Sequence, residues 1–297
     1  MYSVACELRN RGGAPLRCEL RFPALDRPLP IIVVAHGFKG FKDWGFFPHT
    51  GARLAAAGFL SICFNFSGSG IGPDLLNFTE LDRFAADTVS QQVADLGVIL
   101  DGIEDESLFA AARHVAPNLR VDPHHIGILG HSRGSGTAIV RARADARLRA
   151  VVGWAGIGTY YRWTTSELEA WRARGWMEFL NARTGQLMRM NYAAIEDLAA
   201  NRDRYNLERA VTTLDAPLLL IHGDQDASVP VDEARALFAA ARRDRNELRI
   251  LPGAGHTFGA VHPWEGTTPA LETALEHTIT WFARHLSTTT TGGGALA

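Results

Sequence analysis

The stretch HIGILGHSRGSGTA, residues 125–138, decides how the rest of the chain is interpreted. Residues 125–130 are mostly apolar and predict a buried β-strand, and residues 132–144 predict a helix that begins at the serine. Gly130-His131-Ser132-Arg133-Gly134 fits the G-x-S-x-G pattern, in which a serine occupies a tight strand-to-helix turn. Glycines are needed on both sides because such a turn leaves no room for Cβ atoms. Two interpretations stay open here: Ser132 is a nucleophile, or it is a small polar residue in a glycine-rich loop.

Strands and helices alternate along the rest of the chain. The apolar and alternating runs predict strands at 2–8, 16–22, 29–37, 59–64, 125–130, 148–156, 216–226 and 246–255. Runs with helical spacing predict helices at 46–58, 84–103, 132–144, 232–242 and 270–286. This order predicts an α/β fold: a mostly parallel eight-stranded sheet with helices on both faces, opened by an antiparallel hairpin.

One segment breaks this alternation. Residues 157–210 separate two predicted strands by far more than a usual crossover, and they are rich in aromatic, Met and Arg side chains. Their spacing is helical, for example over residues 166–180, so we expect a helical cap beside a cleft. An ordinary pair of packed helices remote from any site is the alternative. The core would then comprise residues 1–156 and 211–286, and the low-complexity tail 287–297 is expected to be disordered.

Composition sets limits on partners and compartment. The chain has 297 residues, 46% hydrophobic and 21% charged, with a net charge of −2. Such values are typical of a globular protein and give no strong field to attract nucleic acid or a membrane. Three cysteines form no disulfide framework or metal motif. No signal peptide or long apolar segment is visible, so a reducing cytoplasm is expected. The oligomeric state is left open, with a homodimer as one option.

A serine hydroxyl needs a base within hydrogen-bond reach, and the base needs a carboxylate to orient it. His256 lies in a loop directly after the last predicted strand, between small residues; a surface loop histidine is the alternative interpretation. Asp226 follows the preceding strand and is our choice for the acid, with Asp224 as the fallback. Because carboxyl ends of parallel strands meet at one edge, Ser132, Asp226 and His256 are expected to converge there.

The oxyanion of a tetrahedral intermediate needs preorganised N–H donors. The residue after the nucleophile, Arg133, supplies one backbone N–H, and the loop after an earlier strand supplies the Phe38 N–H. Gly37 lets that loop approach the site. A simple strand-to-helix turn is the alternative interpretation of this loop.

The motifs HGF, GHSRG, HGDQD and GAGH follow one another in this order, with β/α units between them. Together they resemble the α/β-hydrolase superfamily over roughly residues 16–286. Residues 34–70 are similar to bacterial serine hydrolases near dienelactone hydrolases, feruloyl-type esterases and the catalytic domain of prolyl oligopeptidases. Two departures stand out: dienelactone hydrolases use a cysteine where this chain has Ser132, and prolyl oligopeptidases carry a β-propeller ahead of the hydrolase domain.

The resemblance implies acyl transfer through an acyl-enzyme, with Ser132 as nucleophile, His256 as base and then acid, and Asp226 as the orienting acid. We expect a cytoplasmic serine hydrolase of carboxylic esters that needs no metal or organic cofactor and binds no nucleic acid or membrane. The aromatic side chains of Tyr160, Trp163 and Trp176 are the expected substrate contacts. The alternatives are an amidase or peptidase with the same triad, and a non-catalytic binding protein of the same fold.

Overall fold

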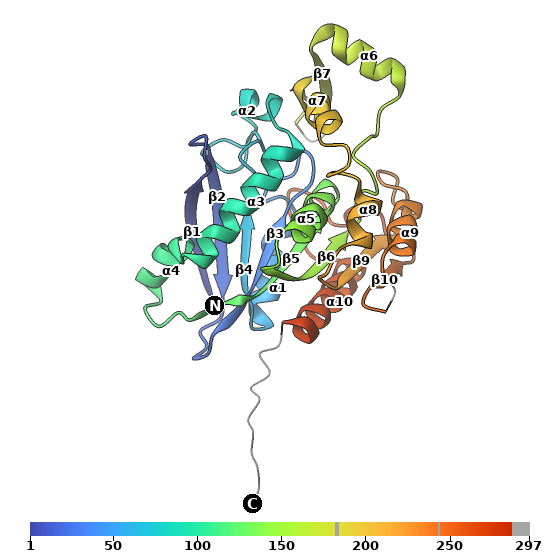
Figure 1. Ribbon diagram of the computed structural model, residues 1–297. Helices are drawn as coiled ribbons and strands as arrows, with labels where there is room; N and C mark the ends of the chain where they lie inside the picture. Colours follow the sequence, from blue (N-terminus) through green and yellow to red (C-terminus); the bar gives the residue numbers. More distant parts are fainter. Residues whose placement is uncertain (182–183, 243, 287–297) are drawn as a thin grey trace, which may run out of the picture.

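The computed structural model describes residues 1–181, 184–242 and 244–286. Its main sheet has eight strands (Figure 1). The spatial order is β1 (Tyr2–Arg9), β2 (Pro15–Phe22), β4 (Leu60–Phe64), β3 (Leu29–Ala35), β5 (Val121–His131), β6 (Leu148–Trp154), β9 (Leu218–Gly223) and β10 (Glu247–Leu251). Strands β1 and β2 pair antiparallel and β2 pairs antiparallel with β4, whereas all later neighbours pair parallel. The predicted mostly parallel eight-stranded sheet is confirmed.

The central strands are buried on both faces, which explains their continuous β-branched sequences. All seven residues of β3 are buried. Ile31 and Val33 belong to one apolar cluster, and Ile32 and Val34 belong to a second cluster on the opposite face. Helices α3 (Val89–Glu104), α5 (Arg133–Ala144), α8 (Leu207–Thr212) and α9 (Val231–Ala240) pack into the first cluster, and α1 (Phe47–Ala56) and α10 (Pro269–His285) pack into the second.

The region predicted as one helix over residues 84–103 is two helices. Helix α2 (Leu81–Ala85) ends before Asp87, and α3 begins only after Thr88. Thr88 has an extended backbone, and its side chain accepts a hydrogen bond from the Gln91 N–H. This arrangement is an N-cap, which starts a new helix instead of continuing the old one. A 3₁₀ turn (Ser107–Phe109) and α4 (Ala110–Val115) then lead into β5.

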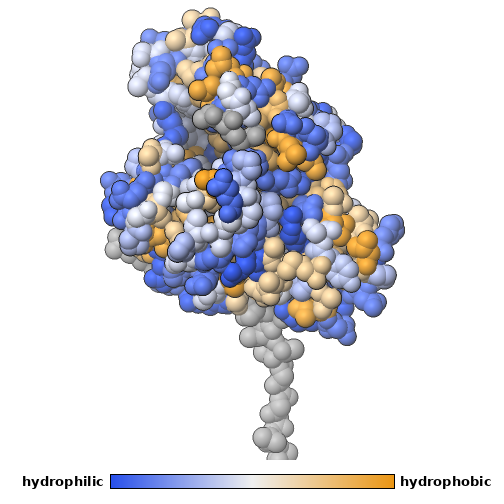
Figure 2. Space-filling model, turned by 180° about the vertical axis from the view of Figure 1, so that it is seen from behind, coloured by the Kyte–Doolittle hydropathy of each residue, from blue (hydrophilic) through white to orange (hydrophobic). Residues whose placement is uncertain are grey.

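The insertion, residues 157–210, contains strands as well as helices. Its elements are α6 (Thr165–Arg174), β7 (Trp176–Asn181), β8 (Gln186–Asn191), α7 (Ala193–Ala200) and the start of α8. The helix predicted over 166–180 is wrong beyond Arg174, because Gly175 adopts a left-handed φ of 78° that ends α6. Strands β7 and β8 pair antiparallel. Figure 1 shows α6, β7 and α7 projecting beyond the main sheet, and Figure 2 shows small separate groups of hydrophobic atoms on the opposite face of the molecule.

Several composition-based expectations can be compared with the described residues. Cys6 and Cys18 are register partners across the β1–β2 hairpin, and both are free thiols. No helix in the described ranges has the length and apolarity needed to cross a membrane. The tail predicted to be disordered, residues 287–297, lies outside the described residues.

Candidate active site

Ser132 occupies the turn between β5 and α5, with a backbone conformation that L-residues rarely adopt. Its φ is 56° and its ψ is −121°. A Cβ atom at Gly130 would lie 2.3 Å from the Gly134 carbonyl oxygen, and one at Gly134 would lie 2.4 Å from the His36 carbonyl oxygen. Side chains at these two positions would therefore separate α5 from the ends of β5 and β3. The strained turn exposes the Ser132 hydroxyl at the carboxyl edge of the sheet.

His256 and Asp226 lie at the same edge and are bonded to each other. The Nδ1 atom of His256 donates to Oδ2 of Asp226 over 2.7 Å. The Asp226 side chain is fully buried, and its Oδ1 accepts the N–H groups of Ser228 and Val229 at 2.8 and 2.9 Å. Because Nδ1 carries the proton, the Nε2 lone pair of His256 is free to accept one. His256 and Ser132 line one pocket.

A second histidine, His222, also contacts Asp226, and it is not among the residues predicted for the site. Its Nε2 lies 3.2 Å from Oδ2 of Asp226 and 2.8 Å from the Val229 carbonyl oxygen. Both partners are acceptors, so Nε2 must carry the proton. Burial alone would raise the pKa of Asp226, but hydrogen bonds from His222, His256 and Val229 outweigh it and hold that pKa well below its usual range. Asp226 is therefore a carboxylate at any physiological pH.

Asp224, the fallback acid, lies elsewhere. Its side chain is exposed, and its Oδ1 accepts the Gly253 N–H over 2.7 Å. This bond joins the loop after β9 to the loop after β10. The structure thus brings Asp226, and not Asp224, to His256.

Two other histidines hold the loops of the site in place. His36 Nε2 accepts the Phe66 N–H over 3.2 Å, and burial lowers its pKa to about 4. His131 Nε2 donates to the His256 carbonyl oxygen over 2.9 Å. Burial, together with the neighbouring His256, lowers the pKa of His131 to about 3. Both imidazoles are therefore uncharged at neutral pH and act as fixed hydrogen-bonding groups.

The loop after β3 lies directly against Ser132. A Cβ atom at Gly37 would lie 2.9 Å from the Ser132 Cβ and 3.4 Å from its Oγ. In the described part of the chain, no hydrogen bond engages the backbone N–H of Phe38 or of Arg133. Arg133 follows Ser132 in the chain and Phe38 follows Gly37, and both residues line the same pocket as Ser132.

These groups open into a cavity of about 350 Å³, here called the Ser132 pocket. It is lined by Phe38, Lys39, Ser132, Arg133, Ile157, Tyr160, Arg162, Trp163, Met190, Ser228, Val229 and His256. Tyr160 and Trp163 come from the insertion, as expected. Trp176 does not line this pocket: its ring lies between the guanidinium groups of Arg174 and Arg189, at 4.1 and 4.2 Å.

Among the described residues, three cations and no acidic side chain line the Ser132 pocket. Arg162 is paired with Glu233 at 2.8 Å, and the Lys39 ammonium donates to the Leu180 carbonyl oxygen over 2.9 Å. The Arg133 guanidinium lies over the Phe38 ring at 5.3 Å and makes no ion pair with any residue that the structure describes. Neither Lys39 nor Arg133 forms an ion pair with a residue that the structure describes, so the pocket contains two cations without a carboxylate partner.

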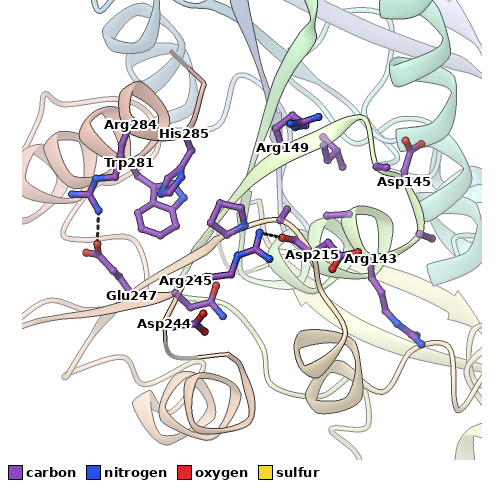
Figure 3. Close-up of a pocket in the computed structure, with 17 residues that line it drawn as sticks. Arg143, Asp145, Arg149, Asp215, Asp244, Arg245, Glu247, Trp281, Arg284 and His285 are labelled. Carbon is purple, nitrogen blue, oxygen red and sulfur yellow. Dashed lines mark hydrogen bonds and ion pairs between the residues drawn. The ribbon is translucent and has the colours of Figure 1, made fainter. Parts of the chain in front are cut away.

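A larger cavity of about 980 Å³ lies at the other edge of the sheet, where β6, β9 and β10 begin (Figure 3). We call it the strand-start hollow. Arginines and acidic residues alternate around it, and Arg284 pairs with Glu247 at 2.7 Å. None of the described residues that line it is a serine or cysteine, so they include no nucleophile of the kind found at Ser132. Size alone therefore does not identify the candidate active site.

Known proteins match this chain over most of its length. The sequence model of the prolyl oligopeptidase family matches residues 103–289. A Bacillus subtilis protein named "Uncharacterized peptidase YuxL" is 22% identical over 261 residues, which are 86% of this chain, and the chain spans only 35% of that relative's length. An Escherichia coli protein named "Putative carboxymethylenebutenolidase" is 24% identical over 269 residues, covering 88% of this chain and 79% of that protein.

The fold also matches solved structures. The crystal structure of the esterase domain of a Rhodothermus marinus protein superposes with a TM-score of 0.62 and 20% identity, covering 97% of this chain and 100% of that one. This match and the sheet topology confirm the predicted α/β-hydrolase fold. The sequence matches confirm the predicted resemblance to the group that contains dienelactone hydrolases and prolyl oligopeptidases.

Proposed function

The chain belongs to the prolyl oligopeptidase family and is a hydrolase, and we propose that it cleaves carboxylic esters through a covalent acyl-enzyme. The observation that carries the proposal is the ordered arrangement of Ser132, His256 and Asp226 at one sheet edge. The strained turn presents a hydroxyl group, the buried carboxylate fixes the imidazole tautomer, and Phe38 and Arg133, whose N–H groups would hold the oxyanion, line the same pocket.

In the first half-reaction Ser132 Oγ attacks the carbonyl carbon of the ester while His256 Nε2 takes the hydroxyl proton. The carbonyl oxygen becomes an oxyanion and accepts the N–H groups of Phe38 and Arg133. Asp226 stays ionised and stabilises the imidazolium that forms. The C–O bond then breaks, and the alcohol leaves with the proton that His256 returns.

In the second half-reaction water replaces the alcohol. His256 Nε2 takes a proton from water, whose oxygen attacks the acyl carbon, and the same two N–H groups hold the oxyanion. Collapse of this intermediate releases the carboxylic acid and returns the proton to Ser132. Each turnover consumes one water molecule and leaves Ser132, His256 and Asp226 in their starting protonation states.

The family match gives a peptidase as the second candidate. The Ser132 pocket favours an ester over a peptide held by its free amino terminus, because such a peptide needs a carboxylate partner and no acidic residue is among the described residues that line the pocket. Arg133 instead offers a free cation beside Phe38. An acyl or alcohol group with aromatic or apolar character and no positive charge fits this lining best.

A substrate panel separates the candidates. The chain is assayed with p-nitrophenyl butyrate, with the corresponding butyryl p-nitroanilide, and with alanyl and prolyl p-nitroanilides that carry a free amino terminus. We expect the ratio of kcat/KM for the ester to kcat/KM for each amide to be much larger than the ratio of their spontaneous hydrolysis rates. If an aminoacyl amide is cleaved as fast as the ester, the chain is a peptidase and the esterase proposal is wrong. If none of these substrates is turned over, the result indicates a binding protein.

A further inference from the structure

The turn after β3 contains an unusual residue at its third position. Gly40 N–H donates to the Gly37 carbonyl oxygen over 3.1 Å, which closes the turn, and Lys39 has a φ of 58°. Glycine is the residue that adopts this left-handed conformation without strain. The turn has glycine at both ends but lysine at the strained position. This indicates that the Lys39 side chain makes a contact that offsets the strain of its backbone.

The Lys39 side chain reaches the insertion. Its ammonium group donates to the Leu180 carbonyl oxygen over 2.9 Å, and Leu180 lies in β7. Burial lowers the pKa of Lys39, so the contact with this carbonyl replaces hydration that the ammonium has lost. Because the acceptor is a main-chain atom, the bond fixes the backbone of the insertion relative to the turn.

The neighbouring Phe38 ring is held between three separate elements. It stacks on Phe84 of α2 at 5.5 Å and meets Phe179 of β7 edge-on at 5.2 Å. The Arg133 guanidinium at the start of α5 lies 5.3 Å from the ring centre. Phe179 of the insertion thus contacts Phe38 of the turn, and Leu180 contacts Lys39.

We infer that Lys39 is a positioning residue, whose bond to Leu180 sets the turn so that the Phe38 N–H points at the oxyanion. This inference rests on the proposed function. If it is correct, the insertion does more than line the pocket: it also helps to set the position of an oxyanion donor. A donor that is misplaced weakens the transition state more than the ground state, so loss of the bond should lower kcat and leave KM nearly unchanged.

The test compares Lys39→Met and Lys39→Arg with Arg189→Met. Arg189 contacts Glu178 and Trp176, both inside the insertion, so its removal perturbs the insertion without touching the turn. With p-nitrophenyl butyrate we expect Lys39→Met to lower kcat about tenfold to a hundredfold, somewhat less than the loss of a whole oxyanion donor, with KM within about twofold. Lys39→Arg should recover most of kcat, and Arg189→Met should match the wild type.

Binding of butaneboronic acid gives a second readout, because its adduct with a serine is tetrahedral and uses the same N–H donors. Lys39→Met should weaken this inhibitor by the factor by which kcat falls. Phe179→Leu, which removes the ring contact and keeps Lys39, should show the same pattern more weakly, so the test does not depend on one variant folding well. Circular dichroism and thermal unfolding check the fold of each variant.

Three results would overturn the inference while the wild type hydrolyses the ester: a Lys39→Met effect on KM alone, an equal loss in Arg189→Met, or inhibitor affinity unchanged in both Lys39→Met and Phe179→Leu. A wild type that hydrolyses no ester would overturn the proposed function, and this inference with it.

Discussion

The two cavities at opposite edges of the sheet differ in how their charges are compensated. The strand-start hollow is nearly three times larger, about 980 Å³ against 350 Å³. Several of its charged side chains have partners: Arg284 pairs with Glu247, Asp145 pairs with Arg147, and Arg245 donates to the Asp215 carbonyl oxygen. The Ser132 pocket combines a strained serine, an ordered imidazole and an Arg133 charge without an ionic partner in the described residues. Preorganised reactive groups, and not cavity volume, therefore distinguish the candidate active site from the strand-start hollow.

The sharpest test of the candidate active site is the choice between Asp226 and Asp224 as the carboxylate partner of His256. Asp226→Asn should lower kcat for p-nitrophenyl butyrate about 10⁴-fold, because the amide favours the wrong imidazole tautomer and no longer stabilises the imidazolium. Asp224→Asn weakens exposed contacts with the Gly253 N–H and the Gln225 side chain, away from His256, and should cost less than about tenfold. Steady-state kinetics on both variants measure the difference, and equal losses would remove Asp226 from the proposed mechanism.

The close approach of Gly37 to Ser132 gives the next largest effect. A Cβ in Gly37→Ala would lie 2.9 Å from the Ser132 Cβ and 3.0 Å from the His131 carbonyl oxygen, so the loop must move away. A displacement of this kind should lower kcat by about a hundredfold. Gly12→Ala, in the exposed β1–β2 turn where the new Cβ meets nothing closer than 3.5 Å, is the control and should leave kcat unchanged. A Gly37→Ala enzyme with normal kcat would contradict the placement of this loop.

The Arg133 cation, which forms no ion pair with any described residue, predicts a preference among esters. Burial raises the pKa of the nearby Asp87 to about 7, so that carboxyl compensates the guanidinium only in part. Arg133→Gln keeps the backbone N–H and should lower kcat/KM for p-nitrophenyl hemisuccinate about tenfold more than for p-nitrophenyl butyrate. Arg172→Gln changes an exposed charge of α6 outside the pocket and should leave the ratio unaltered. An unchanged ratio in Arg133→Gln would show that this cation does not contact substrate.

The smallest effect is expected in the strand-start hollow. Glu247→Gln breaks the bond to Arg284, whose side chain is 55% exposed, so the free energy of unfolding should fall by no more than about 1 kcal/mol. Ester hydrolysis should stay within about twofold of the wild type. Chemical denaturation and the butyrate assay measure the two quantities, and a large loss of hydrolysis would mean that the two edges of the sheet are coupled.

The sequence predicted the sheet and the convergence of the site for one physical reason. Residues that follow parallel strands meet at the carboxyl edge, so Ser132 after β5, Asp226 after β9 and His256 after β10 come together without any distance being known in advance. Gly130 and Gly134 also predicted the tight turn at Ser132, because a Cβ atom at either position would collide with the backbone of a neighbouring segment.

The sequence could not predict the insertion in the same way. Residues 166–180 have helical spacing throughout, and only the left-handed backbone of Gly175 separates α6 from β7. The contact between Lys39 and Leu180 joins positions 141 residues apart, and no local pattern encodes it. His222 could have been found, because it precedes Asp226 by four residues at the end of β9, where a histidine reaches back to the same carboxylate. Local periodicity predicts elements, whereas these contacts depend on how separate elements pack.

The central claim, that Ser132 is the nucleophile, is tested most directly by covalent labelling. The chain is treated with a fluorophosphonate, and the adduct is located by intact mass and peptide mapping in the wild type, Ser132→Ala and Asp224→Asn. We predict one equivalent of label on Ser132 in the wild type and in Asp224→Asn, and none in Ser132→Ala. Label on another residue, label that persists in Ser132→Ala, or no label on a folded wild-type chain would contradict the account.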